Sequence, residues 1–396
     1  MSIPKSVIPI HNGGISFRGL PPLSLYIHIP YCVQKCPYCD FNSHAIKNRL
    51  PEKEYIDALL LDLQSELPNI WGRKIHSIFI GGGTPALFQA ASIEYLLNQI
   101  RALLPLVPDC EITLEANPAV AEKNRFQDFR HAGITRLSLG VQSLSDKHLR
   151  ALGRIHTAQE ALDAIDVAVK TFLRVNVDLM YALPCQTIDD AIADINTLTP
   201  LDLTHISAYQ LTIEPHTAFG HQPPENLPDD DFIVDMEQAV HETLQQAGFQ
   251  RYEISAFARL GHQCQHNLNY WQFGDYLGIG AGAHGKITYP HGIVRTVKHR
   301  SPDFYIQAAH QSNPNAHRDW ILANDLPVEF MMNALRLIDG VPMELFTDRT
   351  GLSILTIQNS LFQARQRGLL SDDNKRLQAT PKGLAFLNEL ISLFLK

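Results

Sequence analysis

Strand-forming and amphipathic segments alternate along the first two thirds of the chain. Short runs that favour strands are followed by stretches with apolar positions three and four residues apart, which is the pattern of successive βα units. The expected strands are 23–29, 75–80, 111–115, 136–141, 174–180 and 205–211. The expected helices are 52–67, 92–104, 121–131, 158–171, 189–198 and 231–247. Connections of this length make the strands parallel, so we predict an α/β fold with an open or partial (βα)6 barrel.

The pattern changes after about residue 250. Residues 266–285 (HNLNYWQFGDYLGIGAGAHG) are rich in glycine and aromatic side chains and predict loops and short strands, whereas the polar residues 301–325 predict a connection. Helical segments, a hairpin and a last helix are then expected at 328–338, 342–349, 354–368, 369–380 and 381–395. This order is typical of a small winged-helix-like α+β domain.

We therefore expect four parts in the chain. They are a flexible leader (1–22), the partial barrel (23–250), a glycine- and aromatic-rich extension with a linker (251–325) and the C-terminal domain (326–396). Residues 327–396 carry no stripe of Lys and Arg on one expected helix, so this domain is expected to be a lid or a docking surface rather than a DNA-binding module.

Composition narrows the class of protein. A chain of 396 residues, 45% hydrophobic and 19% charged, is typical of a globular protein with two or three domains. A net charge of −8 argues against wholesale binding to a nucleic-acid backbone. No apolar run reaches the ~18 residues that a membrane-spanning helix needs, and the first residues lack the apolar centre of a signal peptide. We expect a cytoplasmic protein whose cysteines are reduced.

Three of the six cysteines lie together at Cys32, Cys36 and Cys39, directly after the first expected strand. Chance would place two more cysteines at these spacings from a given one in roughly one case in ten thousand, so a common ligand is expected. Thiolates favour zinc or an iron–sulfur cluster. Zinc would need a fourth ligand, for which His44 is the nearest candidate, whereas a four-iron cluster held by three cysteines leaves one iron open.

Polar residues and glycines follow several of the expected strands. Ligands of βα folds bind at the carboxyl ends of the strands, where Gly82, Gly83 and Thr84 follow the second strand. Glu115, Gln142 and Asp178 stand at or near the ends of the third, fourth and fifth strands. Each of these alone is also explained by a tight turn, a helix cap or a solvated side chain. Together they predict one ligand site beside the cysteines, where Arg154 could pair with a carboxylate.

The segment from Tyr26 to Phe41 (YIHIPYCVQKCPYCDF) resembles the cluster loop of radical S-adenosylmethionine (SAM) proteins. More narrowly, it is similar to the branch that contains the oxygen-independent coproporphyrinogen III dehydrogenases and the HemW-type heme chaperones, and the similarity extends over nearly the whole chain. The resemblance implies a radical SAM barrel, a [4Fe-4S] cluster on the three cysteines, and SAM bound at the open iron. In that superfamily an electron from the cluster breaks a carbon–sulfur bond of SAM and yields a 5′-deoxyadenosyl radical.

The same resemblance implies a set of SAM contacts in this chain. They are Tyr26, Tyr38, Gly82, Gly83, Thr84, Glu115, Gln142, Arg154 and Asp178, with Gln210 and His284 as further contacts. His28, on the first strand, would either donate a hydrogen bond to a cluster sulfur or pack inside the barrel.

Two positions distinguish the members of this branch. The dehydrogenases typically carry a fourth cysteine two residues after the third, where this chain has Phe41. Residues 266–271 match the HNxxYW motif of the HemW-type proteins, and imidazole is a common heme ligand. We therefore expect His266 to lie near bound heme, either as a ligand or as a packed histidine. Cys264 would be an alternative ligand or a buried residue, and Cys110 and Cys185 are expected to be structural.

The function favoured is a heme chaperone that carries the cluster, SAM and heme, and delivers heme to apo-hemoproteins. An oxygen-independent coproporphyrinogen III dehydrogenase and a zinc-stabilised barrel with no redox role are the alternatives, so whether the protein is an enzyme stays open at this point. We expect no nucleic-acid partner, peripheral membrane association through the acceptors, and a monomer or a dimer.

Overall fold

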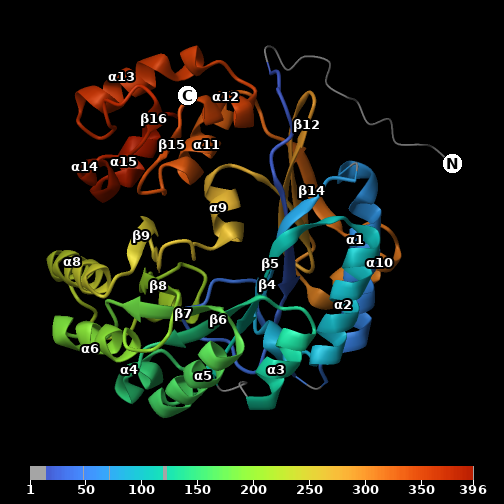
Figure 1. Ribbon diagram of the computed structural model, residues 1–396, viewed down its shortest axis with the longest axis vertical. Helices are drawn as coiled ribbons and strands as arrows, with labels where there is room; N and C mark the ends of the chain where they lie inside the picture. The colour runs from blue at the N-terminus through green and yellow to red at the C-terminus, as the bar shows by residue number, and fades with distance from the viewer. Residues whose placement is uncertain (1–14, 48, 71, 119–122, 396) are drawn as a thin grey trace.

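The computed structural model describes residues 15–47, 49–70, 72–118 and 123–395. Within these ranges the main sheet has twelve strands in the order β14-β13-β12-β11-β1-β4-β5-β6-β7-β8-β10-β9 (Figure 1). Its parallel part consists of β11 (Asp275–Ile279), β1 (Leu23–Ile29), β4 (Ile75–Gly82), β5 (Leu106–Ala116), β6 (Arg136–Gln142), β7 (Arg174–Tyr181) and β8 (His205–Gln210). The six predicted strands are confirmed, and they adjoin in chain order as a (βα)6 unit requires.

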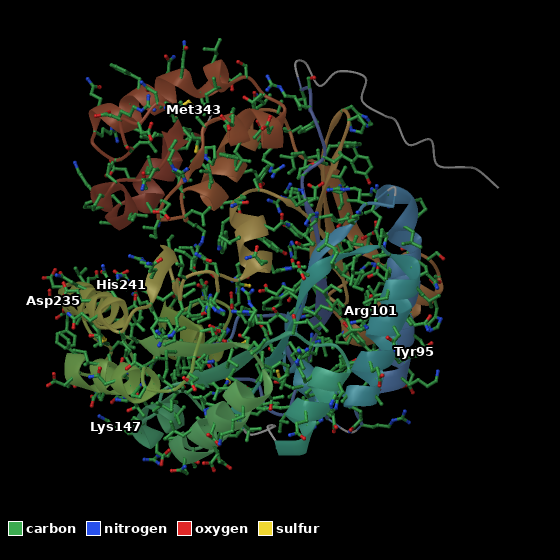
Figure 2. All side chains as sticks on the ribbon, in the orientation of Figure 1. Tyr95, Arg101, Lys147, Asp235, His241 and Met343 are labelled. Atoms are coloured by element: carbon green, nitrogen blue, oxygen red, sulfur yellow. The ribbon has the colours of Figure 1, made fainter. Side chains whose placement is uncertain are left out.

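Helices cover the outer face of this sheet (Figure 1). They are α1 (Glu52–Ile70), α2 (Ala90–Leu103), α3 (Lys123–His131), α5 (Ala158–Thr171), α6 (Ile188–Leu198) and α8 (Asp230–Gln246). Their apolar sides pack on the strands, while outward side chains such as Tyr95 on α2, 49% exposed, meet solvent (Figure 2). The helix predicted at 121–131 is α3, and residues 121 and 122 lie outside the described residues.

Shorter elements complete the barrel. They are β2 (Tyr31–Cys32), β3 (His44–Ala45), the 3-10 helix η1 (Pro85–Leu87), α4 (Asp146–Ala151) and α7 (Ala218–His221). The strands of the barrel turn apolar side chains such as Leu25 and Ile27 toward the helices and polar ones toward the interior, where the Ser24 and Ser77 hydroxyls bond at 2.8 Å. A barrel interior lined with polar groups is the space in which a ligand site can form.

The extension continues the sheet instead of leaving it. β9 (Gln250–Glu253) and β10 (Ala256–Ala258) add antiparallel strands beyond β8, and β12 (His284–Tyr289), β13 (Gly292–Lys298) and β14 (Asn315–Trp320) add them beyond β11. The prediction that residues 301–325 form only a connection is wrong, because this segment holds α10 (Pro302–His310) as well as β14. β14 is polar because it is an exposed edge strand, and polarity alone did not distinguish it from a loop.

The HNxxYW motif lies on a helix, α9 (Gln265–Trp271), and not in loops and short strands as predicted. Its first amide groups are capped from a distant strand: Glu111 Oε1 accepts from Gln265 N at 2.9 Å and from His266 N at 3.4 Å. Because this cap comes from β5, no local pattern around residue 265 could indicate it.

The C-terminal domain is built on its own hydrophobic core, which includes Phe330, Phe346, Leu361 and Leu390. Its elements are α11 (Leu326–Ala334), β15 (Val341–Pro342), α12 (Glu344–Thr350), η3 (Ile354–Ile357), α13 (Gln358–Gln366), β16 (Arg376–Leu377), α14 (Pro381–Ala385) and α15 (Leu387–Ser392). Helices with a small antiparallel β15–β16 pair agree with the predicted winged-helix-like character. The single helix predicted for 381–395 is interrupted at Phe386, which leaves the helical backbone conformation.

The described part of the expected leader contacts this domain. Ile15 and Phe17 pack against its core, and Ser16 N donates to the Gly351 carbonyl at 2.9 Å. Residues 1–14 of that leader lie outside the described residues. The four-part division of the chain stays a prediction. None of the helices in the described ranges is both long and apolar enough to cross a membrane.

A buried ionic cluster attaches the extension to the barrel. Lys298 of β13 is fully buried, and its Nζ lies 2.7 Å from Asp62 and 2.8 Å from Glu66, both on α1. Tyr305 of α10 donates to the second Asp62 oxygen at 2.7 Å. One ammonium thus faces two carboxylates inside the structure, and the Tyr305 hydroxyl adds a neutral donor, so the buried groups depend on one another.

We expect Lys298→Met to lower the free energy of unfolding by about 3–5 kcal/mol, because it leaves two buried carboxylates without a counter-charge. Urea denaturation of the purified protein measures the change. Lys170→Met, which removes an exposed ion pair with Asp166, is the control and should leave the midpoint where it is. Equal midpoints for the two variants would contradict the role given to Lys298.

Candidate functional site

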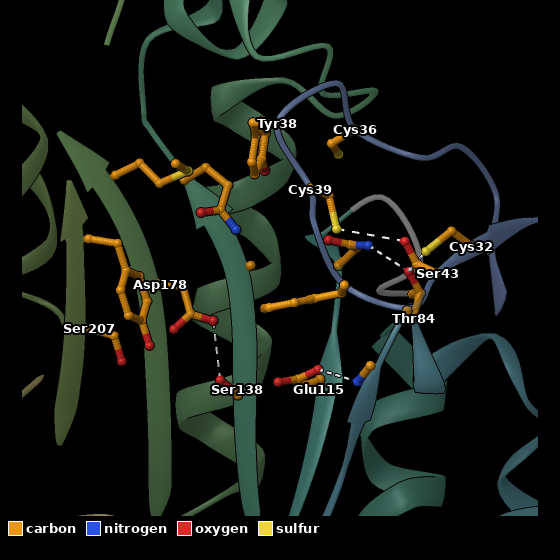
Figure 3. Close-up of a pocket in the computed structure, with 18 of the residues that line it drawn as sticks. Cys32, Cys36, Tyr38, Cys39, Ser43, Thr84, Glu115, Ser138, Asp178 and Ser207 are labelled. Carbon is orange, nitrogen blue, oxygen red and sulfur yellow. Dashed lines mark hydrogen bonds between the residues drawn. The ribbon is translucent and has the colours of Figure 1, made fainter. Parts of the chain in front are cut away.

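The carboxyl ends of the parallel strands open into a cavity of about 350 Å³ that extends into the barrel (Figure 3). Its walls come from the cysteine loop (residues 32–39), the turn after β4, and inward side chains of β5 to β8. The predicted cluster and SAM residues that line it are Cys32, Cys36, Tyr38, Cys39, Gly82, Gly83, Thr84, Glu115, Gln142, Arg154, Asp178 and Gln210. The fold therefore brings most of the predicted set to one place.

Main-chain hydrogen bonds hold the cysteine loop. Gly83 N donates to the Ile29 carbonyl at 2.8 Å, and Thr84 N donates to the Tyr31 carbonyl at 2.8 Å. Farther along, Cys39 N donates to the Cys36 carbonyl at 3.1 Å and closes a turn between these two cysteines. The hydrogen bonds from the turn after β4 thus fix the start of the loop. The turn between Cys36 and Cys39 sets the positions of these two cysteines relative to each other.

Each cysteine sulfur has polar neighbours. Thr84 Oγ1 donates to Cys32 Sγ at 3.7 Å, and Cys39 Sγ and Ser43 Oγ bond at 3.6 Å (Figure 3). Arg154 Nη1 donates to Cys36 Sγ at 3.4 Å. Burial raises the pKa of the Cys32 and Cys39 thiols. The hydroxyl donors Thr84 and Ser43 counter this by stabilising the thiolates that an iron ligand requires.

Zinc and a four-iron cluster make different demands on these thiols. Among the residues that the structure describes, no three His, Cys, Asp or Glu side chains are grouped to hold a single metal ion. His44, the fourth ligand of the zinc alternative, is exposed, and its Nε2 lies 3.3 Å from Asn42 Oδ1. In a four-iron cluster each cysteine binds a different iron atom, so the sulfurs do not need to meet at one point.

Gly82, the last residue of β4, and Gly83, the next residue, lack side chains where neighbouring parts of the protein pack closely. A Cβ on Gly82, whose φ is +117°, would lie 2.6 Å from the His28 ring, and one on Gly83 would lie 2.6 Å from the Tyr31 carbonyl. Both ring nitrogens of His28 are already bonded, to Tyr26 OH at 2.8 Å and to the Asn42 carbonyl at 2.9 Å. His28 thus packs inside the barrel, as one of its two predicted roles required.

Two carboxyl groups face the cavity from neighbouring regions of the wall. Glu115 Oε2 accepts from Gly82 N at 3.0 Å, and burial together with the charge of Asp178 raises the pKa of Glu115 to about 7. Asp178 accepts from Asn176 at 2.9 Å and from Ser138 at 3.3 Å, and burial raises its pKa as well. The pair can accept hydrogen bonds from hydroxyl and amino groups, which is the chemistry of a ribose or an amino-acid end.

Arg154 provides the positive charge beside the cysteines. Its guanidinium donates to the Gly140 carbonyl at 2.6 Å and to Asn117 Oδ1, besides Cys36. Within the described residues its Nε is buried without a partner. An unused donor next to the cysteine loop fits the carboxylate of an amino acid such as the methionyl part of SAM.

Three predicted residues do not line the cavity. Tyr26 bonds His28 and stacks on Phe79, and His284 is exposed at the start of β12. His266 is 3% exposed; its Nδ1 bonds Ser77 Oγ at 3.0 Å, and its Nε2 is buried with no partner in the described ranges. Burial, and next the charge of Arg136, lower the pKa of His266 to about 3, so the imidazole is neutral.

The other cysteines stand apart from the loop. Cys264 is fully buried and donates to Glu111 Oε1 at 3.5 Å, which agrees with a packed residue more than with a heme ligand. Cys110 is buried and Cys185 is exposed. Their assignment as structural residues stays a prediction.

The cavity also contains residues that sequence reasoning missed. They are Phe79, Asn117, Arg136, Ser138, Asn176, Ser207, Tyr209 and Asn267, among others. Side chains two positions apart on a strand share a face, so Gln142 on β6 implied Ser138 and Arg136, and Asp178 on β7 implied Asn176. That signal was present in the sequence. Asn267 had none, because it arrives on a helix that was not predicted.

Comparison with known proteins adds to this geometry. Residues 26–198 match the radical SAM superfamily domain, and residues 321–386 match the HemN C-terminal domain. The chain is 50% identical over 378 residues to the heme chaperone HemW of Escherichia coli (strain K12), with 95% of this chain and 99% of that protein covered. It belongs to the HemW family of radical SAM proteins.

Other relatives agree with this family. The heme chaperone HemW of Haemophilus influenzae is 50% identical, with 95% of this chain and 98% of that protein covered. The mitochondrial radical S-adenosyl methionine domain-containing protein 1 of Danio rerio is 34% identical, with 99% and 92% covered. The solved structure of coproporphyrinogen III oxidase (HemN) from Escherichia coli superposes with a TM-score of 0.81 at 23% identity, covering 95% of this chain and 90% of that one. At this identity the likeness concerns the fold.

Membership of the radical SAM superfamily implies a [4Fe-4S] cluster and SAM. The residues present fit both groups: three cysteines with polar neighbours stand at one end of the cavity, and an arginine with an unused donor and two carboxyl groups stand beside them.

We expect Glu115→Gln to remove a pH dependence of stability. The folded pKa of about 7 exceeds the ordinary value of 4.5, so the protonated form stabilises the fold, and this contribution is lost as pH rises from 4.5 to about 7. Over this range the free energy of unfolding of the Gln variant should rise relative to that of wild type. The difference should reach about 2 kcal/mol. This is below the ~3 kcal/mol of the full shift because the carboxyl is partly open to the cavity. Urea midpoints between pH 4.5 and 8 measure it.

Glu94→Gln on the exposed side of α2 controls for the loss of one negative charge. A wild-type curve that runs parallel to the Glu115→Gln curve at all pH values would contradict the raised pKa.

We expect Cys32→Ser to lose most of the iron and sulfide that anaerobically reconstituted wild type retains, because only three protein thiolates are available to hold the cluster. Iron and sulfide analysis and the visible absorption spectrum measure this. Cys185→Ser removes an exposed thiol outside the loop and should keep the wild-type iron content. Zinc without iron in the wild-type protein would contradict the cluster and favour the zinc-stabilised barrel.

Proposed function

We propose that this protein is a cytoplasmic heme chaperone that carries a [4Fe-4S] cluster, SAM and heme, and delivers heme to apo-proteins. Its support is the 42–50% sequence identity, over 95% of the chain, to proteins named heme chaperone HemW. The observation that carries the choice within the branch is Phe41. This residue lines the cavity where the dehydrogenases typically have a fourth cysteine, and it is 58% exposed.

Cys32, Cys36 and Cys39 would hold the cluster, which supplies one electron at a time when bound. Thr84, Ser43 and Arg154 lower the cost of negative charge on the sulfurs through the hydrogen bonds described above. The guanidinium of Arg154 and the carboxyl groups of Glu115 and Asp178 would orient SAM by its carboxylate, amino and hydroxyl groups. Gly82, Gly83, Gln142, Tyr38 and Gln210 form the remaining wall.

Heme ligation by His266 is part of this proposal. The Nε2 atom is the free nitrogen of the imidazole, and the low pKa keeps it unprotonated and able to bind iron. Tyr26, Phe79 and Tyr270 surround the ring, with centroids 6.4, 5.2 and 5.3 Å away. Heme iron therefore reaches Nε2 only if α9 or these rings move. His266 is not a ligand on the protein surface.

The other candidate functions have less support. Coproporphyrinogen III decarboxylation rests on the fold shared with HemN, and a fold at 23% identity does not carry an activity. A zinc-stabilised barrel has no support from the radical SAM domain match over residues 26–198, which implies an iron–sulfur cluster. Apo-hemoproteins as acceptors, peripheral membrane association through them, and a monomer or dimer complete the proposal.

We expect the reconstituted wild-type protein to bind heme stoichiometrically and to pass it to an apo-hemoprotein. Absorption spectroscopy after gel filtration measures binding, and the appearance of holo-acceptor measures transfer. Anaerobic incubation with coproporphyrinogen III, SAM and a reductant should give no protoporphyrinogen. Failure to bind heme would overturn the chaperone proposal, and turnover of coproporphyrinogen would favour the dehydrogenase.

His266→Ala tests the ligand within the same experiment. We expect its heme complex to show a shifted absorption band and weaker binding, because the iron loses its imidazole. His317→Ala, an exposed histidine of β14, is the matched control. An unchanged spectrum of the His266 variant would exclude this histidine as a ligand and leave the chaperone proposal standing.

A further inference from the structure

A buried arginine lines the cavity far from the cysteine loop. Arg136 is the first residue of β6, is 2% exposed, and lines the cavity together with Gln142 at the other end of the same strand. Six residues of strand separate the two, or about 20 Å. Arg136 therefore marks the floor of the cavity, one strand length below the cysteine end.

The guanidinium of Arg136 makes no hydrogen bond or ion pair within the described ranges. Three carboxyl groups act on it only through space, those of Glu111, Glu115 and Asp178. Glu111 has other partners: its Oε1 accepts from Gln265 N at 2.9 Å, and its Oε2 lies 3.2 Å from Arg174 Nη2 without forming a hydrogen bond in the described ranges. A buried guanidinium whose donors have no acceptor is costly to keep, so a ligand that supplies the acceptor is expected.

A second polar group lines the same cavity, one residue after His266, whose ring lies within the electrostatic reach of Arg136. Asn267 of α9 lines the cavity, and its carboxamide has no hydrogen-bond partner among the described residues. The wall beside them is fixed, because Asn176 donates to Ser138 at 2.8 Å and accepts from Ser207 at 3.0 Å. Two donor groups without a hydrogen bond in the described ranges thus line the same cavity.

We propose that Arg136 and Asn267 form a subsite for a carboxylate group at the floor of the cavity. The planar guanidinium presents two parallel N–H groups that match the two oxygens of a carboxylate, and the amide of Asn267 adds a third donor. The distance from the cysteine loop favours a propionate of heme as the source over the carboxylate of SAM. This choice of source rests on the proposed function, whereas the subsite itself does not.

The test compares ligands with and without the carboxylate. Heme is titrated against heme dimethyl ester, in which both propionates are blocked, and SAM against decarboxylated SAM, using wild type and Arg136→Gln with their clusters in place. We expect wild type to prefer heme over its diester by about tenfold or more, and Arg136→Gln to abolish this preference by weakening heme alone. Arg150→Gln on the exposed side of α4 makes the same charge change and should keep the wild-type preference.

Each outcome decides the proposal. If Arg136→Gln changes the SAM preference instead, the subsite stands with SAM as its source. If the variant changes neither preference, the subsite is overturned, even when heme binding itself is intact. Heme binding that fails in wild type overturns the proposed function, and the SAM titration then decides the subsite alone. Should Arg136→Gln not fold, Asn267→Asp replaces it: the added negative charge should weaken heme and spare the diester.

Discussion

The parallel pairing of β1 with β4 is the constraint on which the site depends. Its register sets Ile29 beside Gly82, so the chain leaving β1 and the turn leaving β4 emerge side by side. Gly83 and Thr84 can then bond the carbonyls of Ile29 and Tyr31, and Thr84 reaches the first cysteine sulfur. The same turn presents Gly82 N to Glu115. A side chain larger than hydrogen at Gly82 or Gly83 would collide with His28 or Tyr31 and separate these parts.

Helix α9 joins the barrel to the C-terminal domain (Figure 1). On one side Asn269 donates to Ser24 Oγ at 3.0 Å and to the Asp275 carbonyl at 2.8 Å. On the other, the Arg336 guanidinium lies 4.3 Å from the centroid of the Trp271 ring, and Trp271 packs on the second core. The HNxxYW residues therefore have structural partners on both sides, and their recurrence as a motif has a packing explanation alongside any contact with heme.

Much of the fold was accessible from the sequence because its patterns are local. Period-two and helical patterns located the six parallel strands and their helices, since each unit buries its own apolar face. The edge strand β14 and helix α9 were missed because their stability comes from elsewhere: β14 from pairing with β13, and α9 from the cap by Glu111. Cysteine spacing and strand-end residues indicated the cavity, yet Arg136 and Asn267 were not found. Finding Arg136 required following the two-residue period of β6 into the barrel. Finding Asn267 required knowing where α9 lies.

The way the cysteine loop is held bears on how far the fold depends on a metal centre. Its ends and its central turn are tied by peptide groups, and the sulfurs have hydroxyl and guanidinium neighbours supplied by the chain. Small zinc domains, by contrast, take their shape from the metal and unfold without it. The barrel instead has an extensive core of buried apolar side chains. Removing a metal centre from the cysteine loop would therefore take away contacts of that loop and leave the main source of the fold's stability in place.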